Sequence, residues 1–82
     1  MWIKCQDNQL VETEALLGFD IVKEKIFDED WVFTGKYILR AIGRHRSKWG
    51  NMKVDMFTGS LAECQERLER LEVGLEVEID LT

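Results

Sequence analysis

Proline is absent from the 82-residue chain, and no low-complexity run, linker or internal repeat interrupts it. Linkers between domains are usually rich in proline, glycine or polar residues, so nothing divides the chain into parts. A second hydrophobic core is not expected at this length either. We therefore expect a single domain over residues 1–82. The hydrophobic share of 45% and the charged share of 33% are typical of a folded globule.

Long apolar stretches are also missing. Charged residues interrupt every apolar run well before the roughly 20 residues that a membrane-spanning helix needs. Residues 1–4 do not begin a secretory signal, which would have a basic start, an apolar stretch and a small-residue cleavage site. Without such a signal, Cys5 and Cys64 are expected to be reduced thiols rather than a disulfide. The sequence therefore predicts a cytoplasmic protein with no membrane segment.

Residues that commonly carry catalysis are scarce. The single histidine, His45, lies between two arginines that would repel a metal ion, and no orienting acid is next to it. A zinc site needs three or four ligands, usually in close pairs, and Cys5, Cys64 and His45 lack that spacing. Ser60 is explained by helix capping, and no glycine-rich phosphate motif is present. We therefore expect no enzyme, no catalytic residue, no metal site and no cofactor.

One segment concentrates positive charge in a chain whose formal net charge is −5. Residues 44–53 contain four lysines or arginines, the histidine and a tryptophan. Most of them fall in a polar, basic loop that we predict over residues 43–51, with Gly43 and Gly50 near its ends. Cations beside an aromatic ring suit single-stranded nucleic acid or RNA. Arginine and tryptophan are also enriched at protein-binding hot spots. The candidate partner-binding residues are Arg44, His45, Arg46, Lys48, Trp49 and Lys53.

Alternating apolar residues predict several short strands. An acidic turn at residues 28–30 separates two of them, and Gly35 is expected to mark a bulge. In the strand that follows, Tyr37, Leu39 and Ala41 share one face. The predicted strands cover residues 1–6, 10–11, 19–27, 31–42, 52–57 and 76–81.

A helix is predicted over about residues 61–73. Ser60 and Glu63 fit a capping box, in which each side chain accepts a hydrogen bond from the backbone of the other. Apolar residues then recur at three- and four-residue spacing, which is typical of one buried helical face; they are Leu61, Cys64, Leu68, Leu71 and Leu75. The pattern as a whole predicts an α+β domain: an antiparallel, curled sheet of about four to six strands, one helix packed on it, and a C-terminal strand.

The predicted C-terminal strand carries Glu76, Glu78 and Asp80 on one face. We interpret this acidic face as the solvent side of the strand. The alternative is that it imitates the spacing of phosphates and binds a basic, DNA-binding protein. If the strand lies at a sheet edge, a second copy of the chain can pair with it, so a homodimer is a further hypothesis.

The opening Met1-Trp2-Ile3-Lys4, the early Leu10-Val11 and the run Ser60-Leu61-Ala62-Glu63 with leucines behind it resemble a group of small uncharacterised proteins. These proteins are found in Gram-positive bacteria, their phages and their mobile elements. They commonly share this start, run through short antiparallel strands and end in an Ala/Leu-rich helix. This chain differs in its longer middle and in the strand after Gly74. The resemblance implies a bacterial or phage origin and an accessory role, and it assigns no catalytic residue.

These observations predict a small, non-enzymatic accessory or regulatory protein that acts by binding a protein partner. The alternative is a nucleic-acid-binding accessory protein that uses the basic segment 44–53. Three tryptophans are many for so small a core, and any that stays exposed would mark an interface; they are Trp2, Trp31 and Trp49.

Overall fold

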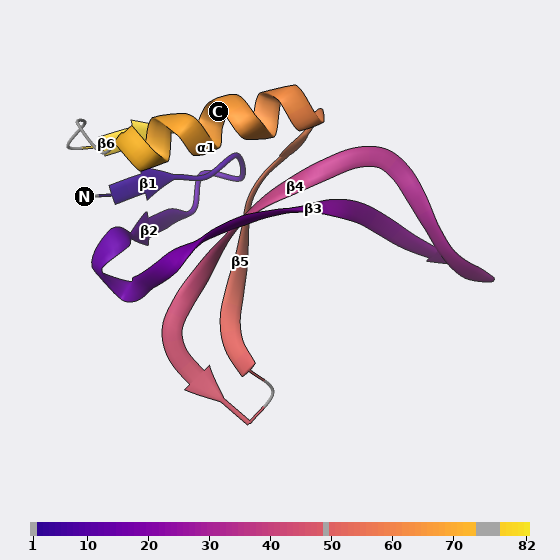
Figure 1. The fold of residues 1–82 in the computed structure, drawn as a ribbon, viewed down its shortest axis with the longest axis horizontal. Coiled ribbons are helices and arrows are strands. Elements are labelled where there is room, and N and C mark those ends of the chain that lie inside the picture. Colours follow the sequence, from indigo (N-terminus) through magenta and orange to yellow (C-terminus); the bar gives the residue numbers. More distant parts are fainter. Residues whose placement is uncertain (1, 49, 74–77) are drawn as a thin grey trace.

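The computed structural model describes residues 2–48, 50–73 and 78–82. Within these ranges it contains six strands, one α-helix and one short 3-10 helix (Figure 1). The predicted α+β class, with mainly antiparallel strands, one helix and a C-terminal strand, is confirmed. In chain order the elements are β1 (Trp2–Lys4), β2 (Leu10–Glu12), the 3-10 helix (Thr13–Ala15), β3 (Leu16–Asp28), β4 (Asp30–Ser47), β5 (Gly50–Gly59), α1 (Leu61–Val73) and β6 (Glu78–Asp80).

The strands divide between two three-stranded sheets, whereas the sequence predicts one sheet of about four to six strands. Sheet A has the order β2-β1-β6, in which β1 pairs antiparallel with β2 and parallel with β6. Sheet B has the order β3-β4-β5 and is antiparallel throughout. The C-terminal strand therefore lies at a sheet edge, next to the first strand of the chain. Residues 76 and 77 of the predicted strand lie outside the described ranges.

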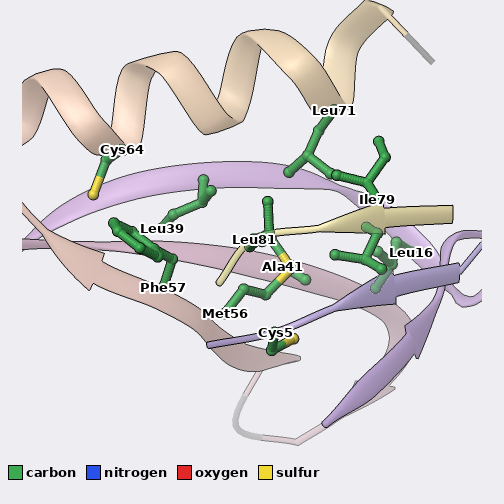
Figure 2. Packing of buried hydrophobic residues seen from close by; sticks show 11 residues of the cluster. Cys5, Leu16, Leu39, Ala41, Met56, Phe57, Cys64, Leu71, Ile79 and Leu81 are labelled. Carbon is green, nitrogen blue, oxygen red and sulfur yellow. The ribbon is translucent and has the colours of Figure 1, made fainter. Parts of the chain in front are cut away.

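One hydrophobic core lies between the helix, sheet A and the middle of sheet B (Figure 2). Among the residues that the structure describes, no buried residue of this core lies between Leu16 and Leu39, or between Ala41 and Met56. The outer parts of the hairpins β3–β4 and β4–β5 therefore extend beyond the core. Among the described residues the core consists of Ile3, Cys5, Leu16, Leu39, Ala41, Met56, Phe57, Cys64, Leu71, Ile79 and Leu81.

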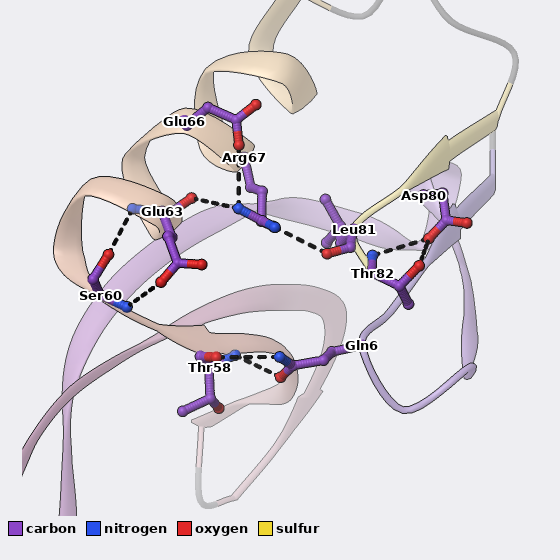
Figure 3. Close-up of polar contacts among 9 residues, drawn as sticks. All are labelled: Gln6, Thr58, Ser60, Glu63, Glu66, Arg67, Asp80, Leu81 and Thr82. Carbon is purple, nitrogen blue, oxygen red and sulfur yellow. Dashed lines mark hydrogen bonds and ion pairs between the residues drawn. The ribbon is translucent and has the colours of Figure 1, made fainter.

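The helix begins and ends where the sequence predicts. Ser60 donates its backbone N–H to Oε1 of Glu63, and Glu63 donates its backbone N–H to Oγ of Ser60, both at 3.1 Å (Figure 3). These reciprocal bonds are the predicted capping box, and they lower the pKa of the Glu63 carboxyl. Cys64 and Leu71 are buried, whereas Leu61 is 39% exposed, so the buried face starts one turn later than expected. Residues 74 and 75 lie outside the described ranges.

Arg67 joins the helix to the C-terminal strand and to β5. Its Nε donates to the backbone oxygen of Leu81 at 3.0 Å, and its Nη1 donates to that of Glu63 at 3.3 Å (Figure 3). The guanidinium carbon also lies 3.9 Å from the centroid of the Phe57 ring. A Cβ atom on Gly59 would approach this ring to 2.7 Å, so β5 ends at a residue that needs to lack a side chain.

A second polar link connects the two sheets. The side chain of Gln6 donates from Nε2 to the backbone oxygen of Thr58 at 3.2 Å and accepts from the Thr58 N–H at 3.0 Å (Figure 3). The backbone N–H of Gln6 also donates to the oxygen of Met56 at 2.8 Å. The segment after β1 is therefore fixed to the last residues of β5.

The longest strand, β4, bends and serves two hairpins. Its 18 residues would span roughly 60 Å if straight, which exceeds the longest dimension of the molecule, 43 Å. Its first part pairs only with β3, its middle pairs with both neighbours, and its last part pairs only with β5. The two hairpin ends consequently point in different directions (Figure 1).

The prediction of a loop over residues 43–51 is wrong in most of its length. β4 continues to Ser47 and β5 starts at Gly50, and the pairs Arg46↔Asn51 and Ser47↔Gly50 close the hairpin. The Asn51 side chain donates to the backbone oxygen of Gly43 at 2.9 Å. The end of this hairpin is held by backbone pairing and by the Asn51 amide rather than by alternating apolar residues. Polar strands of this type therefore lack the apolar alternation by which strands are predicted from sequence.

Candidate functional site

The outer part of the β3–β4 hairpin is a two-stranded projection, which we call the arm and define as residues 23–36. It reaches away from the helix and from sheet A (Figure 1). Five large apolar side chains on it are exposed, with Phe27 at 68% and Trp31 at 65%; the set is Ile26, Phe27, Trp31, Val32 and Phe33. A hairpin without a third strand or a covering layer is marginally stable in water, so a surface of this kind is unusual on an isolated molecule.

One face of the arm is aromatic. Phe27 lies directly opposite Trp31 in the strand pairing, and their rings meet edge to face at 5.5 Å between centroids. Phe33 follows on the same face, opposite Lys25. The ammonium groups of Lys23 and Lys25 lie 4.8 and 4.9 Å from the Phe33 centroid, which is within cation–π range. The aromatic rings are therefore held in a defined arrangement although they are open to solvent.

The opposite face of the arm carries the pair Ile26↔Val32 and, nearer its base, a hydrogen bond from Thr34 Oγ1 to Glu24 Oε1 at 2.7 Å. The pairing shifts between Lys23 and Lys25, where Gly35 has φ of 89°. This shift confirms the bulge predicted at Gly35. The extra residues of the bulge increase the local twist and direct the arm away from the core.

The tip of the arm is a tight acidic turn. Asp28 pairs with Asp30, and Glu29 alone connects them with φ of 61°, a left-handed conformation that residues other than glycine, asparagine and aspartate rarely adopt. The carboxylate of Asp30 accepts the backbone N–H of Trp31 at 2.7 Å. Three carboxylates thus lie at the end of the arm, next to the exposed rings.

The second projection is the end of the β4–β5 hairpin, which we call the basic hairpin and define as residues 44–53. The structure brings most of the predicted partner-binding residues together there in exposed positions, namely Arg44, His45, Arg46, Lys48 and Lys53. Trp49 lies outside the described residues. Met52 adds an apolar side chain that is 60% exposed.

Two of the predicted residues on this hairpin also contribute to the fold. Arg44 donates from Nε to the backbone oxygen of Leu16 at 3.1 Å. Lys53 lies close enough to Asp20 for its charge to help lower the pKa of that carboxyl. The main cause of that lowered pKa is Arg40, which donates from Nε and Nη2 to the two oxygens of Asp20 at 2.9 and 2.6 Å. This half-buried pair ties β3 to β4 where the arm begins.

The acidic C-terminal face is described only in part. Asp80 accepts hydrogen bonds from the backbone N–H and the hydroxyl of Thr82, which lower the pKa of its carboxyl, and Lys4 Nζ lies 3.8 Å from it. Glu76 and the side chain of Glu78 lie outside what the structure describes. Asp80 is thus engaged in local contacts.

Among the described residues no group of three or more His, Cys, Asp or Glu side chains is arranged to hold a metal ion. Cys5 and Cys64 are free and fully buried, and burial raises the pKa of both thiols. His45 lies on the exposed basic hairpin. The chemical features that remain are two exposed projections, one with an acidic tip and exposed aromatic rings and the other basic.

No protein-family model, no curated protein and no solved structure matches this chain. Function is therefore inferred from the geometry of the described residues.

The arm is the feature that residue-by-residue interpretation of the sequence missed. The signal was present, because apolar residues occupy consecutive positions on both sides of the acidic turn, in Ile26-Phe27 and in Trp31-Val32-Phe33. Consecutive apolar residues in paired strands place apolar side chains on both faces of a hairpin. The expectation that an exposed tryptophan would mark an interface applies to Trp31 and, at 49% exposure, to Trp2.

Proposed function

We propose that this chain is a small, non-enzymatic accessory or regulatory protein that binds another protein with its arm. The observation that supports this proposal is the set of exposed aromatic rings held on both strands of a projecting hairpin. A ring of this size has roughly 150–250 Å² to bury. Covering the exposed half to two-thirds of it is worth about 2–4 kcal/mol per ring at the usual coefficient.

The acidic tip of the arm favours a protein partner over a membrane or a nucleic acid. Inserting the tip into lipid would take the carboxylates of Asp28, Glu29 and Asp30 out of water, at a cost that the neighbouring rings do not offset. Phosphate groups would be repelled by the same carboxylates. A protein surface with an apolar depression and a positively charged rim matches both features. As part of this proposal, and on the basis of the sequence, we place the protein in the bacterial cytoplasm. We also propose that its gene belongs to a bacterium, a phage or a mobile element.

The second candidate function is nucleic-acid binding by the basic hairpin. Residues 44–53 contain four lysines or arginines and no acidic residue, and they end an exposed projection. Such a projection can neutralise phosphates. The formal net charge of −5 on the whole chain opposes this use, so protein binding by the arm is the preferred function.

The test is affinity capture from bacterial lysate with the wild type and three variants, with and without nuclease. Phe27→Ser with Trp31→Ser removes the exposed rings. Leu17→Ser is the matched control, because Leu17 is 64% exposed but lies at the start of β3, outside the arm. Arg46→Ala with Lys48→Ala tests the basic hairpin.

We expect one stoichiometric protein that survives nuclease treatment, is kept by the Leu17 variant and is lost with the two arm substitutions. A partner retained by the arm variant would refute the role of the arm. Captured material that disappears with nuclease, and with the Arg46 and Lys48 substitutions, would instead support nucleic-acid binding.

A further inference from the structure

The ends of the two projections carry opposite charge, although Lys23, Lys25 and Lys36 leave the arm as a whole with a formal charge of only −1. The tip of the arm has three consecutive acids, Asp28 to Asp30, whereas the basic hairpin has four lysines or arginines and no acid. Both belong to β4, but the bend of this strand places them at different ends of the molecule (Figure 1). One molecule therefore cannot bring its acidic tip against its own basic hairpin, although the two surfaces are electrostatically complementary.

A second copy of the chain offers the surface that the arm requires. The basic hairpin supplies a positively charged rim, and the exposed Met52 side chain supplies apolar area that adapts to aromatic rings. If one arm contacts the basic hairpin of the other copy, a two-fold axis repeats the contact with the roles exchanged. The contact is then closed, so it produces a dimer rather than a filament.

The area is sufficient for a specific dimer. The three rings of one arm expose roughly 300–400 Å². Two arms, together with an equal area on the surfaces that they cover, bury on the order of 1,200–1,600 Å². Specific protein interfaces begin at about 1,200 Å². Charge makes this orientation selective, because two acidic chains repel each other in arrangements that do not place the basic hairpin near the acidic tip.

We infer that the arm binds a second copy of this chain, with the acidic, aromatic tip of each copy seated against the basic hairpin of the other. This inference rests on the proposed function, since it takes the arm as a binding surface, and it adds the partner. Self-association then covers the exposed rings until a protein with a similarly basic and apolar surface displaces the second copy.

The test uses two charge-reversal variants, whose oligomeric state is measured by sedimentation equilibrium at chain concentrations from roughly 1 μM to 1 mM. The tip variant carries Asp28→Lys and Glu29→Lys, which leaves the hydrogen bond of Asp30 to Trp31 intact. The hairpin variant carries Arg46→Glu and Lys48→Glu, which leaves the bond from Arg44 to Leu16 intact. Far-UV circular dichroism and thermal unfolding confirm that each variant is folded.

We expect the wild type to form dimers and each variant alone to be monomeric, because each homodimer would then contain two like-charged contacts. An equimolar mixture of the two variants is expected to form a heterodimer. In it, one contact is native and the other has both charges reversed, so both are attractive. Loss of the dimer in each variant and its recovery on mixing is the result expected of a contact between the tip and the basic hairpin.

A neutral variant provides a second measurement that does not depend on charge reversal. Trp31→Ser is expected to raise the dimer dissociation constant by roughly 30-fold, as for a hot-spot residue, while Leu17→Ser leaves it unchanged. Higher salt is expected to raise it as well, since the charged contacts lie at the surface.

A wild type that stays monomeric to the highest concentration would overturn the inference and leave the proposed function standing. Dimers that persist in either charge variant, or a Trp31→Ser dimer as tight as that of the wild type, would also overturn it, because they would show a different interface such as the edge of sheet A at β6. The proposed function fails separately, if a captured partner protein is retained by the variant that lacks both Phe27 and Trp31.

Discussion

Replacement of Arg67 with alanine removes a side chain that contacts three elements at once. Arg67 donates a charged hydrogen bond to the backbone oxygen of Leu81, a fully buried residue, at 3.0 Å. A hydrogen bond from a charged group contributes about 1.5–3 kcal/mol. The guanidinium over Phe57 adds about 0.5–2 kcal/mol. The ion pair with Glu66 contributes close to nothing, because the Glu66 side chain is 58% exposed.

We therefore expect Arg67→Ala to lower the free energy of unfolding by about 2–4 kcal/mol, out of roughly 4–12 kcal/mol for a chain of this size. The assay is urea unfolding followed by far-UV circular dichroism. With an m-value of about 1–1.5 kcal/mol/M, the midpoint should fall by roughly 2 M. A change this large would leave the variant close to unfolded at moderate temperature.

Two variants serve as controls for this prediction. Glu66→Ala removes only the exposed ion pair and should change the free energy of unfolding by less than about 0.5 kcal/mol. Arg67→Lys keeps the charge but lacks the planar fork, so it should lie between the alanine variant and the wild type. If Arg67→Ala costs no more than Glu66→Ala, the assignment of Arg67 as the link between the helix and the C-terminal strand is refuted.

Three further predictions concern the packing and the titratable groups. Gly59→Ala is expected to lower the free energy of unfolding by about 1–3 kcal/mol, measured by thermal unfolding, because the added Cβ would press on the buried Phe57 ring. Gly18→Ala is the control and should leave the free energy of unfolding unchanged, because no atom lies within 4 Å of the added Cβ. Equal effects of the two substitutions would contradict this prediction. The pKa of Asp20 is lowered by its bonds to Arg40, so this carboxylate stabilises the fold above its unfolded pKa of about 3.9 and loses its contribution as the pH falls through the lower folded value. Asp20→Asn should therefore lose less stability than the wild type between about pH 4 and pH 2 in denaturant titrations, and parallel curves would argue against the pair. The two cysteines are buried and their pKa values are raised, so neither should react with a thiol reagent at pH 8 until urea is added, when both should.

Local patterns predicted the helix and the strand positions well. The capping box at Ser60 and Glu63 and the apolar spacing behind it determine the helix through contacts within a few residues, so they are visible in the sequence. The shared face of Tyr37, Leu39 and Ala41 followed from strand alternation, and Leu39 and Ala41 are fully buried. The acidic turn at residues 28–30 and the bulge at Gly35 were equally local signals.

Pairings between distant segments were not predictable in the same way. The parallel contact of β1 with β6, which divides the strands between two sheets, joins residues near opposite ends of the chain and leaves no periodic signal. Burial of the strand over residues 19–27 was also uncertain from sequence, because an apolar residue in a strand appears the same whether the core or solvent lies beside it. The consecutive Ile26 and Phe27 indicate apolar side chains on both faces of the strand, but not that this part of the strand extends beyond the core.

The position of β1 between β2 and β6 has a consequence for how the molecule is made. Ile3 lies beside Ile79, so β1 has to wait until β6 is synthesised before sheet A is complete. At 5–20 residues per second, that interval lasts roughly 4–15 s. Throughout it the nascent chain can form the β1–β2 hairpin and sheet B, but Ile3 lacks its neighbour Ile79. Closure of the core is therefore a late event, and a chain truncated before β6 would expose apolar surface rather than form a smaller version of the fold.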